Sequence, residues 1–294
     1  MFNRLGLIGC GLMGGSLSLA LQRAQLVKQV VGYSTSQHTL EVAYRNGVIH
    51  AAAPSAAETA ASADLIVIAV PVAATGKVLQ SIGMYLRDGA VVMDVGSTKQ
   101  NVVDAATSAL GSRLGQFVPA HPIAGKEVAG IEHAEADLYR GKQVILTPTR
   151  RTQIGALQQI TAMWEALDCR VQTMTPQAHD AAFAAISHLP HMAAFALMHS
   201  ILQQNDAADI LALAGSGFRD FSRIAASDPA IWRDIFLCNR DEMLRQTDML
   251  VQALQTFATC IANNDAQRLQ NLIAQASQAR SQWHMTTKDN NSLP

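Results

Sequence analysis

The chain has little charge, few aromatic side chains and no long uninterrupted hydrophobic run. Only 15% of its 294 residues are charged and 5% are aromatic, while 49% are hydrophobic. A disordered chain needs the opposite balance, so a packed protein is expected. Lys and Arg number 22 against 23 Asp and Glu. This balance gives no electrostatic support for a nucleic-acid partner.

The few cysteines form no CxxC pair. Cys10, Cys169, Cys238 and Cys260 are interpreted as buried apolar residues in a reducing compartment, not as a disulfide framework or a zinc site. No apolar stretch reaches about 18 residues, which argues against a membrane span. A glycine-rich motif follows residues 1–4 almost at once, which leaves no room for a signal peptide. We therefore predict a cytoplasmic protein with no membrane partner.

The first half alternates short β-branched runs with Ala- and Leu-rich helical stretches. Continuous apolar runs such as Asp64–Val70 and Ala90–Asp94 suit strands that are buried on both faces. The β-α-β alternation predicts a Rossmann-like, doubly wound and mainly parallel α/β sheet. Further strands are predicted over Leu5–Ile8, Gln29–Tyr33, Gln116–Pro119, Gln143–Leu146 and Arg170–Met174, and helices over Ser16–Leu26 and Ile154–Leu167. The Ala-rich stretch 51–63 is helix-prone.

From Thr175 onward the strand signal disappears. Thr175 can cap a helix that begins with Pro176, and the sequence stays helical to about residue 284. Pro190 is predicted to interrupt a helix and free a backbone carbonyl. The predicted organisation is a dinucleotide-binding domain over 1–174, an all-α domain over 175–285 and a disordered tail over 286–294.

The helical half is apolar on more than one face. Ala193 and the run Phe195–Met198 are nearly continuous. Such helices need a second covering surface. We therefore predict a homodimer in which the helical halves of two chains pack together.

The segment Gly9-Cys10-Gly11-Leu12-Met13-Gly14 is a G-x-G-x-x-G motif between a predicted strand and a predicted helix. The first glycine allows a tight turn, the second lets the backbone approach a pyrophosphate, and the third allows close helix–strand packing. The helix N-terminus then faces the negative charge. We predict that Gly9, Gly11, Leu12, Met13 and Gly14 bind a dinucleotide; the alternative is a glycine-rich turn without a ligand.

The loop after the second strand indicates which dinucleotide binds. An acid there would accept hydrogen bonds from the ribose 2′-hydroxyl and repel a 2′-phosphate. This chain has Ser34-Thr35-Ser36-Gln37-His38 instead. Three hydroxyls and a histidine can donate to a phosphate, so NADP is favoured over NAD, with Ser34, Thr35 and Ser36 as contacts. No arginine stands in the loop, and ordinary turn residues remain the alternative.

Ligands in such a fold lie outside the carboxyl ends of the strands. Val70 and Pro71 end one strand and are expected to border the cofactor, and the segment Asp94–Lys99 should lie closer to the nicotinamide. His121 follows the Gln116–Pro119 strand on the same side. A histidine can accept a proton from an alcohol during hydride removal, and Ser97 can orient it. The alternative is a loop histidine with an ordinary hydrogen bond.

The helical half adds further polar side chains. His188 and His191 have no carboxylate or cysteine at ligand spacing, so no metal site is predicted. Arg219 and Arg223 are i,i+4 neighbours that can share one helix face. Arginine matches a carboxylate with two parallel hydrogen bonds. A plain surface arginine is the alternative.

Seven motifs occur in order along about residues 4–284. They are GCGLMGGS, AVPV, DVGSTK, HPIAGKEVAG, LTPT, SHLPH and GFRDFSRIAASDPAIWRDI. Together they resemble the prephenate/arogenate dehydrogenases of tyrosine biosynthesis. The glycine motif is generic, whereas HPIAG, SHLPH and the last segment are specific. No segment resembles a fused chorismate mutase or an ACT regulatory domain. The resemblance implies a Rossmann-like domain followed by a helical dimerisation domain.

The resemblance also implies a reaction, an oxidative decarboxylation. Hydride leaves C4 of a cyclohexadiene for the nicotinamide, the 4-hydroxyl loses its proton, and CO2 leaves C1 as the ring becomes aromatic. By matching motifs, His121 would be the base on the 4-hydroxyl, and Ser97 would hydrogen-bond both. His191 would help to hold the substrate, and Arg223 would hold a substrate carboxylate.

Three more residues match positions at the mouth or wall of the family's pocket: Glu127, Asp220 and Trp232. In a dimer some of them would come from the partner chain. The side chain of prephenate carries a keto group, and that of arogenate carries an ammonium. An acid such as Glu127 or Asp220 would favour arogenate, and NADP use leans the same way, so arogenate is favoured.

Two other classes remain open. A dehydrogenase of 3-hydroxyacids would share the Rossmann-plus-helical architecture, but it relies on a lysine in the helical half, where only Lys288 occurs. A non-catalytic NADP-binding sensor would not need His121, Ser97 and Arg223 together.

Overall fold

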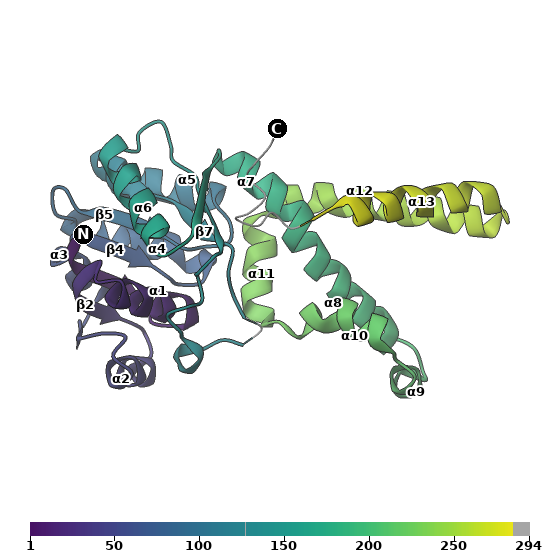
Figure 1. The fold of residues 1–294 in the computed structure, drawn as a ribbon, viewed down its shortest axis with the longest axis horizontal. Helices are drawn as coiled ribbons and strands as arrows, with labels where there is room; N and C mark the ends of the chain where they lie inside the picture. The colour runs from purple at the N-terminus through teal and green to yellow at the C-terminus, as the bar shows by residue number, and fades with distance from the viewer. Residues whose placement is uncertain (127, 285–294) are drawn as a thin grey trace. The chain divides into compact units, whose positions relative to one another are not determined.

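The computed structural model describes residues 1–126 and 128–284, which fall into two compact units, Met1–Arg240 and the segment from Asp241 onward. The first unit contains a six-stranded sheet in the order β3-β2-β1-β4-β5-β6, and every pair of neighbouring strands in it is parallel (Figure 1). The strands are β1 (Phe2–Ile8), β2 (Val27–Tyr33), β3 (Ala51–Ala52), β4 (Leu65–Ile68), β5 (Val91–Asp94) and β6 (Phe117–Val118).

Helices cover both faces of this sheet. Alternate residues of β4 show why: Leu65 and Val67 belong to one buried cluster with Trp164, while Ile66 and Ile68 belong to another. A strand that is buried on both faces has no polar side, so its sequence is a continuous apolar run. The helices are α1 (Leu12–Arg23), α2 (Gln37–Arg45), α3 (Ala56–Ala61), α4 (Val72–Ile82), α5 (Gln100–Leu110) and α6 (Ile154–Ala166). The predicted Rossmann-like, doubly wound fold is confirmed.

The strand order reverses between β1 and β4, and this arrangement brings several loops to one edge. Gly9 and Ala69 follow the carboxyl ends of these two strands, and the Ala69 amide donates to the Ile8 carbonyl at 2.7 Å. Val95 follows β5, and its amide donates to the Ile68 carbonyl at 3.2 Å. The loops after β1, β4 and β5 therefore lie side by side where ligands bind in such sheets.

The predicted Gln116–Pro119 strand is wrong in its extent, because the chain changes sheets there. Only Phe117–Val118 pairs in the large sheet, and β7 (Ala120–Pro122) then opens a second, three-stranded sheet. Pro119 has no amide hydrogen with which to continue the parallel ladder. Its carbonyl instead accepts from the Thr147 amide at 2.9 Å. His121 consequently lies inside a strand and not after one.

The second sheet has the order β7-β8-β9. Its other strands are β8 (Gln143–Leu146), which is antiparallel to β7, and β9 (Arg170–Thr173), which is parallel to β8. Both strands occur close to their predicted ranges, but they lie in this second sheet and not in the doubly wound one. The helix-prone stretch 51–63 is only partly helical, since β3 occupies its start and α3 begins at Ala56, capped by Ser55.

The helical part begins as one continuous rod. Thr175 accepts from the Ala178 amide at 3.2 Å and caps α7 (Pro176–Phe183), as predicted. A π turn over Ala184–His188 leads directly into α8 (Leu189–Leu202). Pro190 was expected to interrupt the helix, and this is wrong. A wider π turn precedes the proline, so the missing amide hydrogen falls where the helix is already irregular.

Shorter helices complete the first unit: α9 (Ala207–Ala212), α10 (Ser216–Ser222), a 3₁₀ turn over Arg223–Ala226 and α11 (Pro229–Cys238). The side chain of Asp228 accepts from the Ala230 and Ile231 amides at 2.8 and 3.0 Å and so caps α11. The second unit contains most of α12 (Arg240–Ala262) and all of α13 (Ala266–Gln282). The proposed division at residue 174 stays a prediction, and the proposed disordered tail, 286–294, lies outside the described residues.

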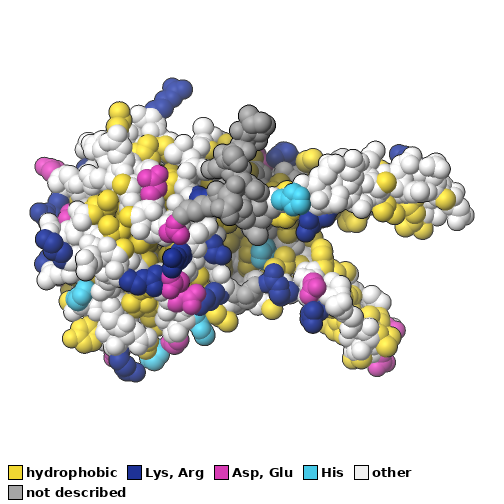
Figure 2. Space-filling view, in the orientation of Figure 1, with side chains coloured by type: hydrophobic (Ala, Val, Ile, Leu, Met, Phe, Trp, Pro, Cys, Tyr) yellow, Lys and Arg dark blue, Asp and Glu magenta, His cyan; other side chains and the backbone are white. Residues whose placement is uncertain are grey.

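The long helical rod is poorly covered within its own unit. Pro176–Leu202 is long and apolar enough, by length and composition, to cross a membrane, but only 22% of its most apolar window is buried. Leu202, Leu213 and Leu237 are more than half exposed. Hydrophobic side chains also lie on the surface of α12 and α13 (Figure 2), among them Leu254 and Ile273. Each unit thus presents apolar surface that the single chain leaves exposed.

Candidate active site

The glycine motif adopts the backbone that its sequence predicts. Gly9 has a φ of +96°, and a Cβ there would lie 2.3 Å from the Ala69 carbonyl oxygen. A Cβ on Gly14 would lie 2.1 Å from the Gly9 carbonyl oxygen, so α1 packs closely on the turn. A Cβ on Gly11 would meet nothing within 4 Å. The first and third glycines are therefore needed by the fold, and the second leaves open space beside the N-terminus of α1.

This open space fits a dinucleotide pyrophosphate. Gly11 is the N-cap of α1 and has no side chain to bond the first amides of the helix, so those of Leu12 and Met13 point toward its free end. Val70 flanks the same turn, since one of its methyl carbons lies 3.1 Å from the Cβ position of Gly9. Pro71, the N-cap of α4, follows it. The structure brings these predicted cofactor contacts to one edge of the sheet.

The loop after β2 carries hydroxyl groups. Ser34 accepts from the Ser36 amide at 3.2 Å, and Ser36 accepts from the Thr39 amide at 3.2 Å as the cap of α2. Thr35 and Ser36 are exposed, and Ser34 is half-buried. Because both serine hydroxyls act as acceptors in these bonds, their hydrogens can still be donated. The sequence between Tyr33 and His38 contains no carboxylate that would repel a 2′-phosphate.

A buried ion pair organises the loop after β5. Asp94 and Lys99 have side chains that are 1% and 0% exposed, and the Lys99 ammonium donates to the Asp94 carboxylate. The ammonium also donates to the Ala120 carbonyl at 2.7 Å, while the same carboxylate accepts from the Ala120 and Gly96 amides at 3.2 and 2.8 Å. The pair therefore ties the end of β5 to the residue before His121. Sequence reasoning missed this role of Lys99.

His121 is bonded to a second histidine that sequence reasoning also missed. Its Nδ1 lies 2.8 Å from Nε2 of His179 on α7, and His179 Nδ1 lies 2.7 Å from the Asp180 carboxylate. Phe183 packs on both rings, with centroid separations of 4.8 and 4.5 Å. The sequence did offer a signal for His179: it is followed directly by Asp180 near the start of a helix capped by Thr175. His121 itself is half-buried, so one nitrogen of its ring remains approachable.

The surroundings keep His121 neutral. Burial lowers its pKa well below the usual value, and electrostatic repulsion from His179, Lys99 and His188 lowers it further. Burial also lowers the pKa of His179, which the hydrogen bond to Asp180 opposes. A neutral imidazole has a lone pair, and so it can act as a base. The position of His121 therefore suits proton abstraction.

Two histidines of the SHLPH segment lie beside this group. His188 is 1% exposed, and burial lowers its pKa to about 4. The Asn239 amide donates to His188 Nδ1 at 3.2 Å and to the Asp180 carbonyl at 2.9 Å. The proton of neutral His188 therefore sits on Nε2, which is buried without a hydrogen-bond partner among the described residues. This leaves a donor where a bound molecule can supply an acceptor.

His191 forms one wall of the candidate substrate region. Its ring stacks on Trp232 with centroids 3.5 Å apart and planes inclined by 19°, and its Nδ1 donates to the Ser187 carbonyl at 2.9 Å. Nε2 is then the acceptor nitrogen. Arg223, in the 3₁₀ turn after α10, lowers the pKa of His191 by its positive charge, after the larger effect of burial. Trp232, His191 and Arg223 thus lie in one neighbourhood.

The remaining predicted residues are placed differently. Ser97 is half-buried, two positions before Lys99, and its predicted contact with His121 stays a prediction. Asp220 is exposed and pairs with its neighbour Arg219 at 3.3 Å. The structure gives no contact that draws Asp220 toward His121 within the part of the chain it describes. Glu127 lies outside the described residues.

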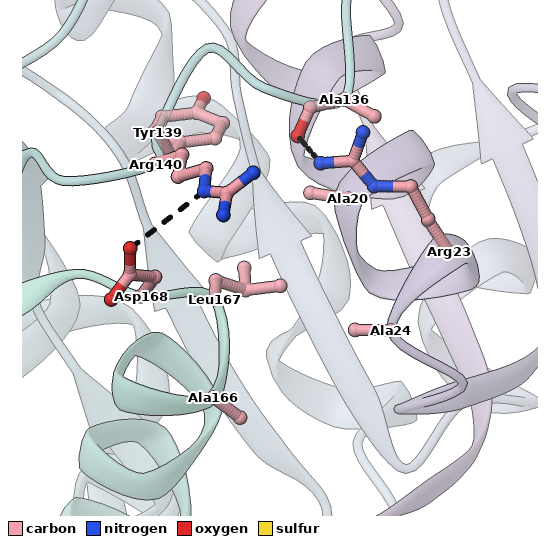
Figure 3. Close-up of a pocket in the computed structure, with 9 residues that line it drawn as sticks. All are labelled: Ala20, Arg23, Ala24, Ala136, Tyr139, Arg140, Ala166, Leu167 and Asp168. Atoms are coloured by element: carbon pink, nitrogen blue, oxygen red, sulfur yellow. Dashed lines mark hydrogen bonds and ion pairs between the residues drawn. The ribbon is translucent and has the colours of Figure 1, made fainter.

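A separate hollow is found away from these residues. It has a volume of about 300 Å³ and lies between the C-terminal end of α1 and the end of α6 (Figure 3). Arg140 and Asp168 face each other across one side at 3.8 Å, and Arg23 donates to the Ala136 carbonyl at 3.1 Å. Both arginines already have partners, and none of the predicted site residues lines this hollow.

Comparisons with known proteins agree on one family. The family model for the prephenate dehydrogenase nucleotide-binding domain matches residues 17–173, and that for the prephenate dehydrogenase dimerization domain matches residues 175–275. A prephenate dehydrogenase of Bacillus subtilis (strain 168) is 35% identical over 90% of this chain and 71% of its own length. A cyclohexadienyl dehydrogenase of Zymomonas mobilis is 30% identical over 95% of this chain and 96% of its own.

A solved structure is similar over almost the whole chain. It is a prephenate dehydrogenase from A. aeolicus in complex with hydroxyphenyl propionate and NAD+. It has 33% sequence identity and a TM-score of 0.89, and the match covers 96% of this chain and 98% of that one.

Proposed function

Because this chain belongs to the prephenate/arogenate dehydrogenase family, we propose that it oxidatively decarboxylates a cyclohexadienyl acid with His121 as the base. One observation carries the proposal. A neutral, half-buried imidazole, bonded through Nδ1 to His179, lies beside the loop after β5, at the edge where the glycine motif would place a dinucleotide. This is the juxtaposition that hydride removal from an alcohol requires.

The proposed cofactor is NADP. Gly9, Gly11, Leu12, Met13 and Gly14 would hold its pyrophosphate, which the open space beside Gly11 supports. When bound, the nicotinamide supplies the two-electron oxidation by accepting hydride. Three hydroxyl residues after β2 (Ser34, Thr35 and Ser36), in a loop without an acid, favour the 2′-phosphate of NADP over the 2′-hydroxyl of NAD.

The chain's own residues would divide the remaining chemistry. His121 would take the proton of the substrate 4-hydroxyl on Nε2, and Ser97 would hydrogen-bond that hydroxyl. Arg223 would hold a substrate carboxylate, and His191, stacked on Trp232, would hold the ring region. The carboxylate that leaves as CO2 must not be held tightly, since binding that stabilises only the ground state does not raise turnover.

Arogenate is the proposed preferred substrate. Its side chain bears an ammonium, which needs an acceptor, whereas the keto group of prephenate needs a donor. Asp220 is an exposed carboxylate on α10, and Glu127 is the acid of the HPIAGKEVAG motif. Either acid, from this chain or from a partner chain, would supply that acceptor.

A homodimer is the proposed assembly. The poorly covered rod Pro176–Leu202 lies within the segment that matches the dimerization domain of the family, and it needs an apolar cover. The same apolar rod of a second chain would supply that cover. The cytoplasm is the proposed compartment, since the four cysteines are free, as in reducing conditions.

The test offers arogenate and prephenate with NADP and NAD in all four combinations and follows absorbance of the reduced nicotinamide. We expect turnover, highest with arogenate and NADP. His121→Asn is expected to lower kcat by about 10²–10⁴-fold with a small change in KM. The matched control is His133→Asn, at an exposed histidine of the 3₁₀ turn Ile131–His133, which should leave kcat unchanged. Cofactor binding without turnover in all four mixtures would instead favour the non-catalytic sensor.

A further inference from the structure

Asp180 is held in place by three donors. One carboxylate oxygen accepts from the Lys99 amide at 2.8 Å and from His179 Nδ1 at 2.7 Å, and the other accepts from the Gln100 amide at 2.8 Å. The two amides belong to the start of α5, where an anion is favoured by the helix dipole. The side chain is 5% exposed. The carboxylate therefore has one orientation, and it acts only as an acceptor.

The fixed acceptor determines the protonation pattern of both histidines. A carboxylate accepts from His179 Nδ1, so that nitrogen carries the hydrogen, and Nε2 of a neutral His179 is an acceptor. His121 Nδ1 must then donate across the 2.8 Å contact. The lone pair of neutral His121 is left on Nε2, to which no described residue is hydrogen-bonded. A base needs its lone pair at that nitrogen.

We propose that His179 and Asp180 are positioning residues that hold His121 in its Nδ1–H tautomer and share the positive charge that it gains in the reaction. The proposal rests on the proposed function for the identity of the reaction. It concerns a different matter, the source of the basicity of His121. The side chains act through His121 and do not touch the substrate.

The charge balance of the proton step explains why His121 needs His179 and Asp180, which together with it form a proton relay. The substrate O–H bond breaks, an N–H bond forms at His121 Nε2, and the electron pair stays on oxygen as hydride leaves the adjacent carbon. The ring that becomes cationic faces His179 and His188 from the helical rod and Lys99 from the loop after β5. Lys99 is itself paired with Asp94. Movement of the His121 Nδ1 hydrogen onto His179 Nε2 brings the charge next to Asp180.

The decisive variant is Asp180→Leu. A leucine has nearly the shape of the aspartate but offers no acceptor, so a hydrogen on His179 Nδ1 would have no partner. A neutral His179 then carries its hydrogen on Nε2 and donates it to His121 Nδ1. His121 then carries its own hydrogen on Nε2. We expect kcat to fall about 10²–10⁴-fold with little change in KM. Asp88→Leu, at an exposed carboxylate, is the matched control and should leave kcat unchanged.

The tautomer is measured directly by ¹⁵N NMR of the full chain labelled at histidine, with the His121 signals assigned from His121→Asn. Neutral ring nitrogens with and without hydrogen are well separated. We expect Nδ1–H in the wild type and Nε2–H in Asp180→Leu. His179→Gln is a second variant, whose amide oxygen can still accept from His121 Nδ1, so we expect Nδ1–H with lowered kcat.

The spectrum needs no substrate, so it separates the two proposals. Absence of turnover with either cyclohexadienyl acid would refute the proposed function and leave the tautomer result standing. A wild-type spectrum with hydrogen on His121 Nε2 would overturn the relay. So would an Asp180→Leu variant that keeps the wild-type kcat, or one that loses activity with the His121 tautomer unchanged.

Discussion

Replacing Lys99 with methionine is expected to lower the free energy of unfolding by about 3–5 kcal/mol, because it leaves a buried carboxylate without its cation. The lysine side chain is 0% exposed and that of its partner Asp94 is 1% exposed. After the change, the amides of Gly96 and Ala120 are the donors to Asp94 that remain among the described residues. At about 2–4 °C per kcal/mol for a unit of this size, the Tm should fall by about 6–20 °C.

The measurement is urea unfolding followed by circular dichroism, with Lys77→Met as the control. Lys77 is exposed on α4, so its loss should change the stability by less than about 0.5 kcal/mol. The double variant Lys99→Met/Asp94→Asn removes both charges and should be more stable than Lys99→Met alone. A loss below about 1 kcal/mol in Lys99→Met would show that breaking the pair leaves no uncompensated buried charge, and would refute the reasoning.

Four further outcomes are expected. Arg223→Ala should raise the KM for the cyclohexadienyl substrate about 10–100-fold with a small change in kcat, since it removes a charged hydrogen bond worth about 1.5–3 kcal/mol; steady-state kinetics checks this, and a purely kcat effect would mean a different role. Gly11→Ala should fold normally and bind the dinucleotide at least about tenfold more weakly, whereas Gly14→Ala should be unstable, because its Cβ would lie 2.1 Å from a carbonyl oxygen; calorimetry and thermal unfolding separate the two. Ser34→Asp should lower the ratio of NADP to NAD activity about tenfold or more, and an unchanged ratio contradicts the assignment. The pKa of His188 falls from 6.5 to about 4 on folding, so its neutral form contributes about 3 kcal/mol to the free energy of unfolding above pH 6.5. This contribution is lost as the pH falls toward 4. A His188→Gln variant should lack this part of the pH dependence of the free energy of unfolding.

The α/β fold was predictable because its strands are buried on both faces. Runs such as Asp64–Val70 have no polar side, and in a chain that alternates such runs with helices this pattern is typical of a covered parallel sheet. The pairing of β7, β8 and β9 was not predictable in the same way. Which strands pair depends on residues far apart in the chain, and the change of sheets at Pro119 leaves only a two-residue strand as its local sign.

In the candidate site too, residues with a local sequence signal were predicted, and residues that depend on distant partners were missed. The glycines are predicted because each meets a backbone demand that only glycine satisfies, and Gly9 and Gly14 show those demands as contacts. His179 was missed because it reaches His121 across 58 residues of sequence. Lys99 was placed in the right loop, but the direction of its side chain depends on Asp94 and on the strand that carries Ala120.

The π turn at Ala184–His188 determines the direction in which the side chains of α8 point around the helix axis. Such a turn amounts to one additional residue in an α-helix, and a residue advances an α-helix by about 100°. Deleting one residue there would rotate His191 and the rest of α8 around the axis relative to His179, with almost no change in composition. The one-residue insertion in the helix therefore determines how His191 is oriented relative to His179.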